Sequence, residues 1–182
     1  VAGNIVVVGG GNTAMDAARL AKRSGAESVT LVYRRTRKYM PADEHELALA
    51  LADGVEFAEL AAPVKQADGV LKCEKMVLGE ADASGRRSSV GSGEFFTVPC
   101  DLVISAVGEQ VDDALMAANG IELGKKGRPA FQTNVEGVYA AGDAKRGPAT
   151  VVEGIADAAA FAEAVIGKPY TYAVSYTHLR AH

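Results

Sequence analysis

The segment IVVVGGGNTAMDAAR, residues 5–19, joins an apolar run to a glycine turn and then to an alanine-rich stretch. Gly9 would permit a tight turn, Gly11 would let a ligand approach the backbone, and Ala14 would let helix and strand pack closely. Because the N–H groups of the first helical turn would face an anion, the segment predicts a cradle for a dinucleotide pyrophosphate. The contacts are expected from Gly9, Gly10, Gly11, Asn12, Thr13 and Ala14. The plainer alternative is a glycine turn that binds nothing.

A second group of candidate residues follows the next expected strand, 29–33. An NAD site would place Asp or Glu about 20 residues past the glycines, where it accepts hydrogen bonds from the ribose 2′-hydroxyl. Here the strand leads instead into Arg34 and Arg35. Since a guanidinium can bind a phosphate through two parallel hydrogen bonds, the sequence predicts NADPH, with its 2′-phosphate, as the ligand. The alternative is a solvated basic cluster at the exit of a strand.

Two later turns could also meet a ligand. Val107 and Gly108 end an apolar strand at the sheet edge where ligands of doubly wound folds bind, although a plain strand exit is equally consistent. Gly142 and Asp143 follow the apolar segment VYAA and precede an expected helix whose first amides lie near Val151. The aspartate could bind a sugar or ribityl hydroxyl while the helix end receives a phosphate or ring carbonyl. Alternatively, the aspartate only satisfies the backbone of its turn.

Strand and helix patterns alternate along the first half of the chain, which predicts an α/β fold with βαβ units and a Rossmann-like parallel sheet. Asp68 and Gly69 predict a hairpin turn, and the polar stretch 79–94 predicts a mobile, solvated loop. Asp16 could meet Arg19 one helical turn later, which favours a structural role over a catalytic one. Just beyond Gly108 the expected elements become short and are separated by turn residues, which predicts a domain boundary near 108–112. The expected strands are 5–8, 29–33, 55–60, 72–78, 95–98, 101–107, 121–123 and 138–141, and the expected helices 13–24, 43–53, 113–119 and 150–166.

Composition narrows the class of protein. The 182 residues are 48% hydrophobic and include 20 glycines, which suits a globular α/β protein of one or two domains. The net charge of −4 argues against a nucleic-acid partner. Because no apolar run approaches the ~20 residues of a membrane span and no leader precedes Val1, we expect no membrane association and a cytoplasmic location. The first strand begins almost at once, so we expect a fragment of a larger protein.

The cysteines and histidines indicate neither a metal site nor a catalytic pair. Cys73 and Cys100 are 27 positions apart, without the spacing of a redox disulfide or a metal knuckle. His45 lies between two glutamates on an expected exposed turn, where a solvated role is expected. His178 and His182 could share a helical face, but no further ligand joins them.

Taken in order, these motifs resemble the glutamate synthase small subunit family of NADPH-dependent FAD oxidoreductases, within the pyridine nucleotide-disulfide oxidoreductase superfamily. The segments GEQ and RGPATVV are most similar to the selenate-reductase-like branch of this family. The resemblance covers about residues 1–168. Its segments are VVVGGGNTAMDAARLAKRSGA, VTLVYRR with MPA, DGVEF, LGEADASGRR, DLVISAVGEQ and GVYAAGDAKRGPATVVEGIADA.

The resemblance implies an NADPH-binding domain over 1–108, the C-terminal portion of an FAD-binding domain over 109–169, and an unmatched tail over 170–182. Hydride would pass from NADPH to FAD, and electrons onward to iron–sulfur clusters or a partner redox subunit. Val107 and Gly108 would lie beside the nicotinamide, and Gly142, Asp143 and Val151 would form the second FAD contact. The family's first FAD fingerprint and its cluster-binding cysteines are absent here, so we expect an incomplete FAD site that depends on N-terminal regions missing from this sequence.

Two other functions remain open from the residues. A dehydrogenase that reduces a substrate with NADPH directly would, in its short-chain form, carry a Tyr-x-x-x-Lys pair, which this sequence lacks. A non-catalytic dinucleotide-binding module would bind NADPH without turnover. Nucleotide binding followed by an assay for flavin reduction separates these hypotheses from the flavoprotein one.

Overall fold

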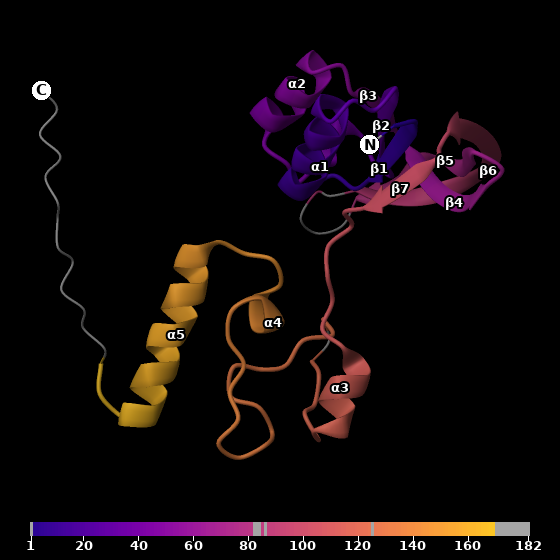
Figure 1. Ribbon diagram of the computed structural model, residues 1–182. Coiled ribbons are helices and arrows are strands. Elements are labelled where there is room, and N and C mark those ends of the chain that lie inside the picture. The colour runs from indigo at the N-terminus through magenta and orange to yellow at the C-terminus, as the bar shows by residue number, and fades with distance from the viewer. Residues whose placement is uncertain (1, 82–84, 86, 125, 170–182) are drawn as a thin grey trace, which may run out of the picture. The chain divides into compact units, whose positions relative to one another are not determined.

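The computed structural model describes residues 2–81, 85, 87–124 and 126–169. The chain divides into two compact units, one from Val1 to Gly108 and the other from Glu109 onward (Figure 1). The expected tail over 170–182 lies outside the described residues.

The first unit is built on a parallel sheet of four strands. These are β1 (Asn4–Val8), β2 (Ser28–Tyr33), β3 (Glu56–Glu59) and β7 (Leu102–Ser105), in the order β3-β2-β1-β7. Helices α1 (Asn12–Arg23) and α2 (Glu44–Ala52) connect the first three strands, and a 3-10 turn spans Arg37–Tyr39. Because the strand order reverses beside β1, the carboxyl ends of β1 and β7 flank a topological switch point. The predicted α/β fold with βαβ units is confirmed.

One face of this sheet packs against α1 and α2 through small side chains. Ala14, Met15, Ala18 and Ala21 form the buried face of α1. They join alternate residues of β1 and β2 in one apolar cluster, because alternate side chains of a strand point to the same face.

A short ion-pair network joins α1 to α2. Arg19 Nε donates to Asp53 Oδ2 at 2.9 Å, and a terminal nitrogen of Arg19 lies 3.3 Å from Glu46. The hydrogen bond to Asp53 is the main cause that raises the pKa of Arg19, and Asp16 adds a weaker charge interaction without an ion pair among the described residues. Glu46 of α2 and Asp53, directly after α2, thus present two carboxylates to Arg19 across the helix interface. Its guanidinium, together with that of Arg23, holds the pKa of the Asp53 carboxyl below its ordinary value.

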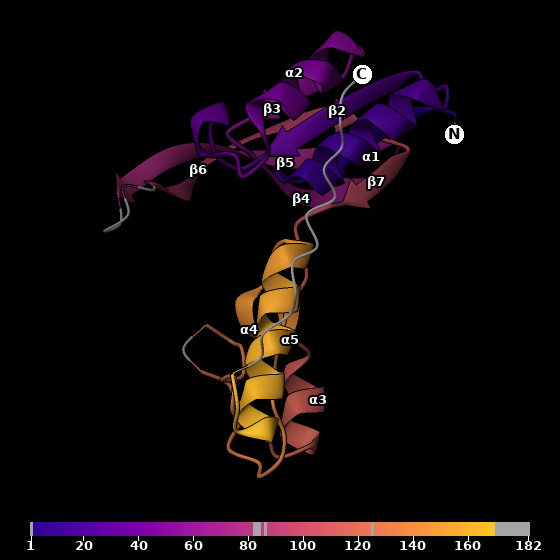
Figure 2. The ribbon, with the colours of Figure 1, turned by 90° about the vertical axis from the view of Figure 1, so that its left-hand side faces the viewer.

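The other face of the parallel sheet packs against an antiparallel sheet of β4 (Ala61–Ala67), β5 (Val70–Ala81) and β6 (Arg87–Pro99) (Figures 1 and 2). Asp68 and Gly69 have φ angles of 53° and 73°, as the predicted hairpin turn between β4 and β5 requires. The predicted loop over 79–94 is wrong, because most of these residues extend β5 and β6. The side chains of β6 from 87 to 94 are almost all exposed, so the stretch shows no alternation of apolar and polar residues that could indicate a strand.

Cys73 and Cys100 are buried between the two sheets as free thiols. Burial raises the pKa of each thiol, so little reactive thiolate forms near neutral pH. We expect both thiols to resist a disulfide-exchange reagent in the folded chain and to react once a denaturant unfolds it. Absorbance of the released thiol chromophore measures this, and rapid labelling of either cysteine in the folded chain would contradict it.

The second unit contains α3 (Asp113–Ala118), α4 (Asp143–Arg146) and α5 (Val151–Ile166). The strands expected at 121–123 and 138–141 are wrong, because the described residues there form only the isolated bridges Leu123–Pro129 and Gln132–Tyr139. No third segment pairs with them among residues 109–124 and 126–169, and a two-stranded pair is marginal by itself. Edge-to-face ring contacts of 5.6 and 5.3 Å place Tyr139 between Phe131 and Phe161.

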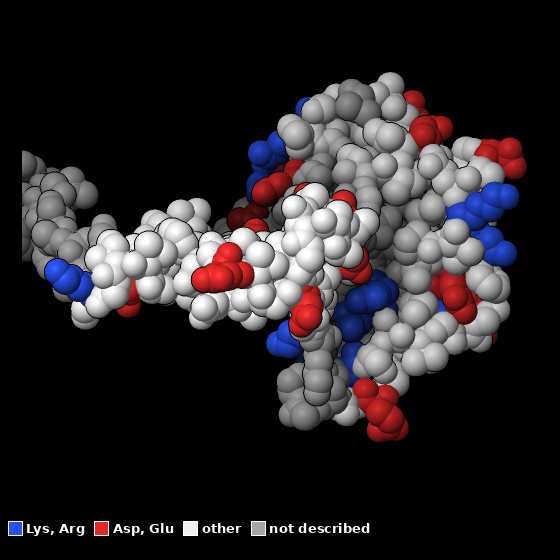
Figure 3. Space-filling model, turned by 90° about the horizontal axis from the view of Figure 1, so that it is seen from below, with Lys and Arg blue, Asp and Glu red and all other residues white. Residues whose placement is uncertain are grey.

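Two further features are the length and hydrophobicity of the helices and the distribution of surface charge. No helix among the described residues is long and apolar enough to cross a membrane. On the face drawn in Figure 3, Lys and Arg side chains are interspersed with Asp and Glu.

Candidate dinucleotide-binding site

The glycine turn after β1 lies against the end of β7. The N–H of Gly9 donates to the carbonyl of Val32 at 3.1 Å, and the φ of Gly9 is 152°. A Cβ at Gly9 would overlap the carbonyl oxygen of Ala106, directly after β7. Glycine is therefore required here both by conformation and by the close approach of the two strand ends.

Gly10 and Gly11 differ in what surrounds them. A Cβ at Gly10 would overlap the ring of Tyr33, whereas a Cβ at Gly11 would meet no atom within 4 Å. Gly11 is also the N-cap of α1, which has no side-chain cap and no acidic residue in its first turn. The N–H groups at this helix end are thus accessible and uncompensated, a combination that fits an anionic group.

The expected phosphate contacts Asn12 and Thr13 are exposed at the first turn of α1, and Ala14 is buried as its packing role requires. The side chain of Asn12 has a second role that the sequence did not indicate. Its Oδ1 accepts from the N–H of Asp43 at 3.0 Å, and the N–H of Ala42 donates to the carbonyl of Gly10 at 3.0 Å. The loop before α2 therefore braces the glycine turn.

The predicted 2′-phosphate residues lie just after β2 and have different surroundings. Arg34 is exposed, and no partner for its side chain occurs within the described part of the chain. Arg35 Nε donates to the backbone carbonyl of Arg87 at 3.0 Å. Arg37 pairs with Glu44 at 3.2 Å and lines a cavity of about 390 Å³ with the start of α2. Arg34 is thus fully available to a phosphate, and Arg35 retains its two terminal nitrogens.

The residues predicted beside the nicotinamide leave β7 at the same edge of the sheet. The N–H of Ala106 donates to the carbonyl of Val8 at 2.8 Å, so the chain passes next to the glycine turn. Val107 follows with 70% of its surface exposed, and Gly108 has a φ of 91°. The structure therefore brings Val107 and Gly108 to the switch point where Gly9 lies.

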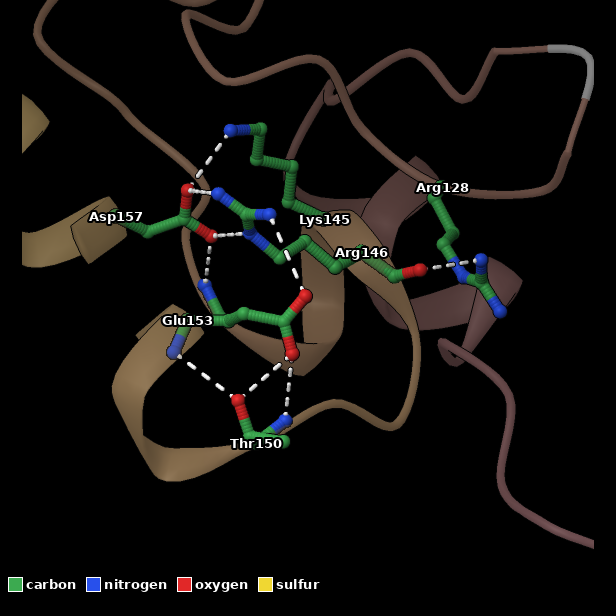
Figure 4. Close-up of polar contacts among 7 residues, drawn as sticks. Arg128, Lys145, Arg146, Thr150, Glu153 and Asp157 are labelled. Carbon is green, nitrogen blue, oxygen red and sulfur yellow. Dashed lines mark hydrogen bonds and ion pairs between the residues drawn. The ribbon is translucent and has the colours of Figure 1, made fainter. Parts of the chain in front are cut away.

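In the second unit, the turn at Gly142 is held by a carboxylate that the sequence did not single out. Asp157 of α5 is 1% exposed and accepts from the N–H of Gly142 at 3.0 Å, from Lys145 at 2.9 Å, and from two nitrogens of Arg146 at 2.6 and 2.7 Å (Figure 4). Arg146 and then Lys145 hold the pKa of Asp157 far below its ordinary value. The only signal for Asp157 in the sequence was an aspartate among the alanines of the expected helix.

Asp143, in contrast, is exposed at the first residue of α4, and its carboxylate has no hydrogen bond to another described residue. The sequence left open that Asp143 only satisfies the backbone of its turn. The N–H of Gly142 donates to Asp157 instead, so this turn does not need the Asp143 carboxylate. The Asp143 carboxylate is therefore available to a ligand hydroxyl.

Helix α5 begins with a capping box between Thr150 and Glu153 (Figure 4). The Thr150 N–H donates to Glu153 at 2.9 Å, which lowers the pKa of that carboxyl, and the Glu153 N–H donates to Thr150 Oγ1 at 3.3 Å. The cap leaves the N–H of Val151, the residue predicted to contact a ligand, unused. A cavity of about 620 Å³ lies beside this helix end, and its cationic lining is Lys126, Arg128, Lys145 and Arg146.

A parallel sheet with a glycine turn at its switch point and an uncapped helix behind it defines an α/β domain of the FAD/NAD(P)-binding type. The chain belongs to the pyridine nucleotide-disulphide oxidoreductase family, whose model matches residues 1–158.

Two relatives and one solved structure show the extent of the similarity. The chain is 42% identical over 188 residues to the NADPH-Fe(3+) oxidoreductase subunit beta of Geobacter sulfurreducens, a match that covers 85% of this chain and 28% of the relative. It is 43% identical over 175 residues to the glutamate synthase [NADPH] small chain of Azospirillum brasilense, covering 89% and 36%. The structure of Mycobacterium tuberculosis FprA in complex with NADPH has a TM-score of 0.62 at 19% identity, covering 94% and 56%.

These similarities confirm the family predicted from the motifs, and the NADPH prediction agrees with the names of both relatives. The chain spans only 17 to 42% of the length of the curated relatives it matches.

Proposed function

We propose that this chain is the NADPH-binding part of a flavoprotein oxidoreductase that passes hydride from NADPH to FAD and electrons onward to iron–sulfur clusters or a partner subunit. The observation that carries the proposal is the uncapped N-terminus of α1 beside Gly11, where space, exposed N–H groups and the absence of an acidic residue in the first turn favour a pyrophosphate. The two relatives with NADPH in their names support this choice of nucleotide.

In this proposal the residues of the first unit bind and orient the nucleotide. The N–H groups from Gly11 to Thr13 hold the pyrophosphate, and Arg34 and Arg35 bind the 2′-phosphate. Val107 and Gly108 border the nicotinamide. Bound FAD would supply the redox chemistry, so the chain needs no acid–base pair of its own for the hydride step.

The second unit, 109–169, is proposed as the C-terminal portion of an FAD-binding domain. The Asp143 carboxylate would accept hydrogen bonds from ribityl hydroxyls, and the N–H of Val151 would donate to a flavin carbonyl or phosphate. Both groups are unused by the described residues. The larger share of the relatives' length that this chain does not span is where the remaining FAD contacts and the electron acceptor would lie.

Removing Arg34 tests the choice of nucleotide. If each charged hydrogen bond contributes about 1.5–3 kcal/mol, Arg34→Ala weakens NADPH binding roughly 10–100-fold and leaves NADH binding nearly unchanged. Isothermal titration with each nucleotide measures both affinities. Arg23→Ala is the matched control, because it removes the same charge from a guanidinium that pairs with Asp53 instead. Equal affinity of the unchanged chain for NADPH and NADH would contradict the assignment.

A separate titration tests the FAD role. Asp143→Ala should lower the affinity for FAD and leave NADPH affinity unchanged. Measurements of flavin fluorescence, and of dye reduction by NADPH with added FAD, report on the two steps. A chain that binds NADPH tightly but retains no flavin would support the NADPH-binding part of a larger reductase. A chain that binds no nucleotide would contradict both this proposal and a non-catalytic dinucleotide-binding module.

A further inference from the structure

Arg35 is tied to the antiparallel sheet through both its backbone and its side chain. Its carbonyl accepts from the N–H of Leu60 at 3.1 Å, and the carbonyl of Leu60 accepts from the N–H of Met76 on β5 at 2.7 Å. Its side-chain Nε donates to the carbonyl of Arg87 at 3.0 Å, at the first residue of β6. The direction of the Arg35 guanidinium is therefore set by a strand 52 residues further along the chain.

The side chain of Arg87 holds that carbonyl in place. The register of β5 and β6 shifts between Leu78 and Ala81, so Gly79 has no partner residue in the ladder. Arg87 Nε donates to the carbonyl of Gly79 at 2.7 Å, and a terminal nitrogen of Arg87 donates to the carbonyl of Leu78 at 3.1 Å. Because a bulge leaves ladder carbonyls unpaired, these bonds close the end of the hairpin and fix the backbone of Arg87.

With Nε engaged, Arg35 keeps two terminal nitrogens, which is the geometry that grips a phosphate through two parallel bonds. We propose that Arg87 is a positioning residue that strengthens the preference for NADPH over NADH by fixing the guanidinium of Arg35. The inference rests on the proposed function, since it concerns the same 2′-phosphate. A guanidinium that is oriented before binding loses less conformational entropy when the phosphate arrives, so its bonds yield more affinity.

Replacing Arg87 tests this role. Arg87→Ala should raise the Kd for NADPH about 3–10-fold while the Kd for NADH changes by less than about twofold. NADH affinity also reports whether the variant is folded, because the pyrophosphate cradle serves both nucleotides. Lys75→Ala is the matched control, since it removes the same charge from the same hairpin but from a side chain that pairs with Glu94 at 2.9 Å. This control should leave both affinities unchanged.

A double-mutant cycle identifies the route of the effect. In an Arg35→Ala background, Arg87→Ala should cause no further loss of NADPH affinity, because the residue that it positions is gone. Additive losses, or an equal loss of NADPH and NADH affinity, would overturn the inference. A ratio of NADPH affinity to NADH affinity that Arg87→Ala leaves unchanged overturns the inference alone, whereas an unchanged chain that does not prefer NADPH overturns the proposed nucleotide as well.

Discussion

Replacing Gly9 with alanine is expected to destabilise the first unit by about 2–5 kcal/mol, because the new methyl group meets the carbonyl of Ala106 and the backbone conformation disfavours a side chain. A domain of this size has a total stability of about 5–15 kcal/mol, so much of the fold's stability would be lost. NADPH binding would be lost with it. Urea unfolding followed by circular dichroism measures the change.

Gly11→Ala is the informative comparison, since both changes add one methyl group to the same turn. A Cβ at Gly11 meets no protein atom within 4 Å, so the stability should fall by less than about 1 kcal/mol. NADPH and NADH affinity should nevertheless both fall, because the methyl group occupies space assigned to the phosphates. Unimpaired nucleotide binding by a stable Gly11→Ala chain would contradict the position of the pyrophosphate.

Removing the charge of Asp157 is expected to open the turn over 142–147 in the second unit. Asp157→Asn keeps the shape of the side chain but leaves Lys145 and Arg146 without their buried counter-charge. Trypsin cleavage after these two residues should become about tenfold faster or more, because the opened state is more populated. Asp143→Asn is the control, since that carboxylate is exposed, and it should leave the cleavage rate unchanged. Equal rates for the two variants would contradict the structural role of Asp157.

Acid should reproduce the effect of Asp157→Asn. The pKa of Asp157 is lowered in the folded chain, so its ionised form contributes stability above its ordinary pKa of 3.8. This contribution declines as the pH falls below 3.8 toward the folded value. The difference in stability between the unchanged chain and Asp157→Asn should therefore be largest near neutral pH and shrink in acid. Thermal unfolding of both chains at several pH values provides the measurement.

Much of the first unit could be predicted from the sequence because local signals and long-range packing agree there. The run from Ile5 to Val8, the glycines and the small residues of α1 each indicate the same strand, turn and helix. The strands at 72–78 and 95–98 were predicted, but the continuation of the β5–β6 hairpin into 79–94 was missed for the opposite reason. Backbone pairing creates it, while its exposed side chains carry no periodic signal.

The candidate site shows a similar division. The cradle and the exposed Arg34 follow from short motifs, and the structure brings them to one edge of the sheet. The brace from Asn12 to Asp43, the anchor from Arg35 to Arg87 and the buried Asp157 join residues between 11 and 52 positions apart. Such contacts depend on tertiary geometry, and no local sequence pattern indicates which residue pairs with which.

The parallel pairing of β1 with β7 has a consequence for how this protein acquires its fold. Ile5 pairs with Leu102, so β1 presents an open hydrogen-bonding edge until almost the whole of the first unit has been synthesised. Pairing β1 with β7 closes a long loop, and the entropy cost of closure comes before the strand contacts stabilise the sheet. We therefore expect β7 to join the sheet late and folding to be slow. A chain shortened before Leu102 would leave the hydrogen-bonding edge of β1 open to other chains, so aggregation is the expected outcome and not a smaller working unit.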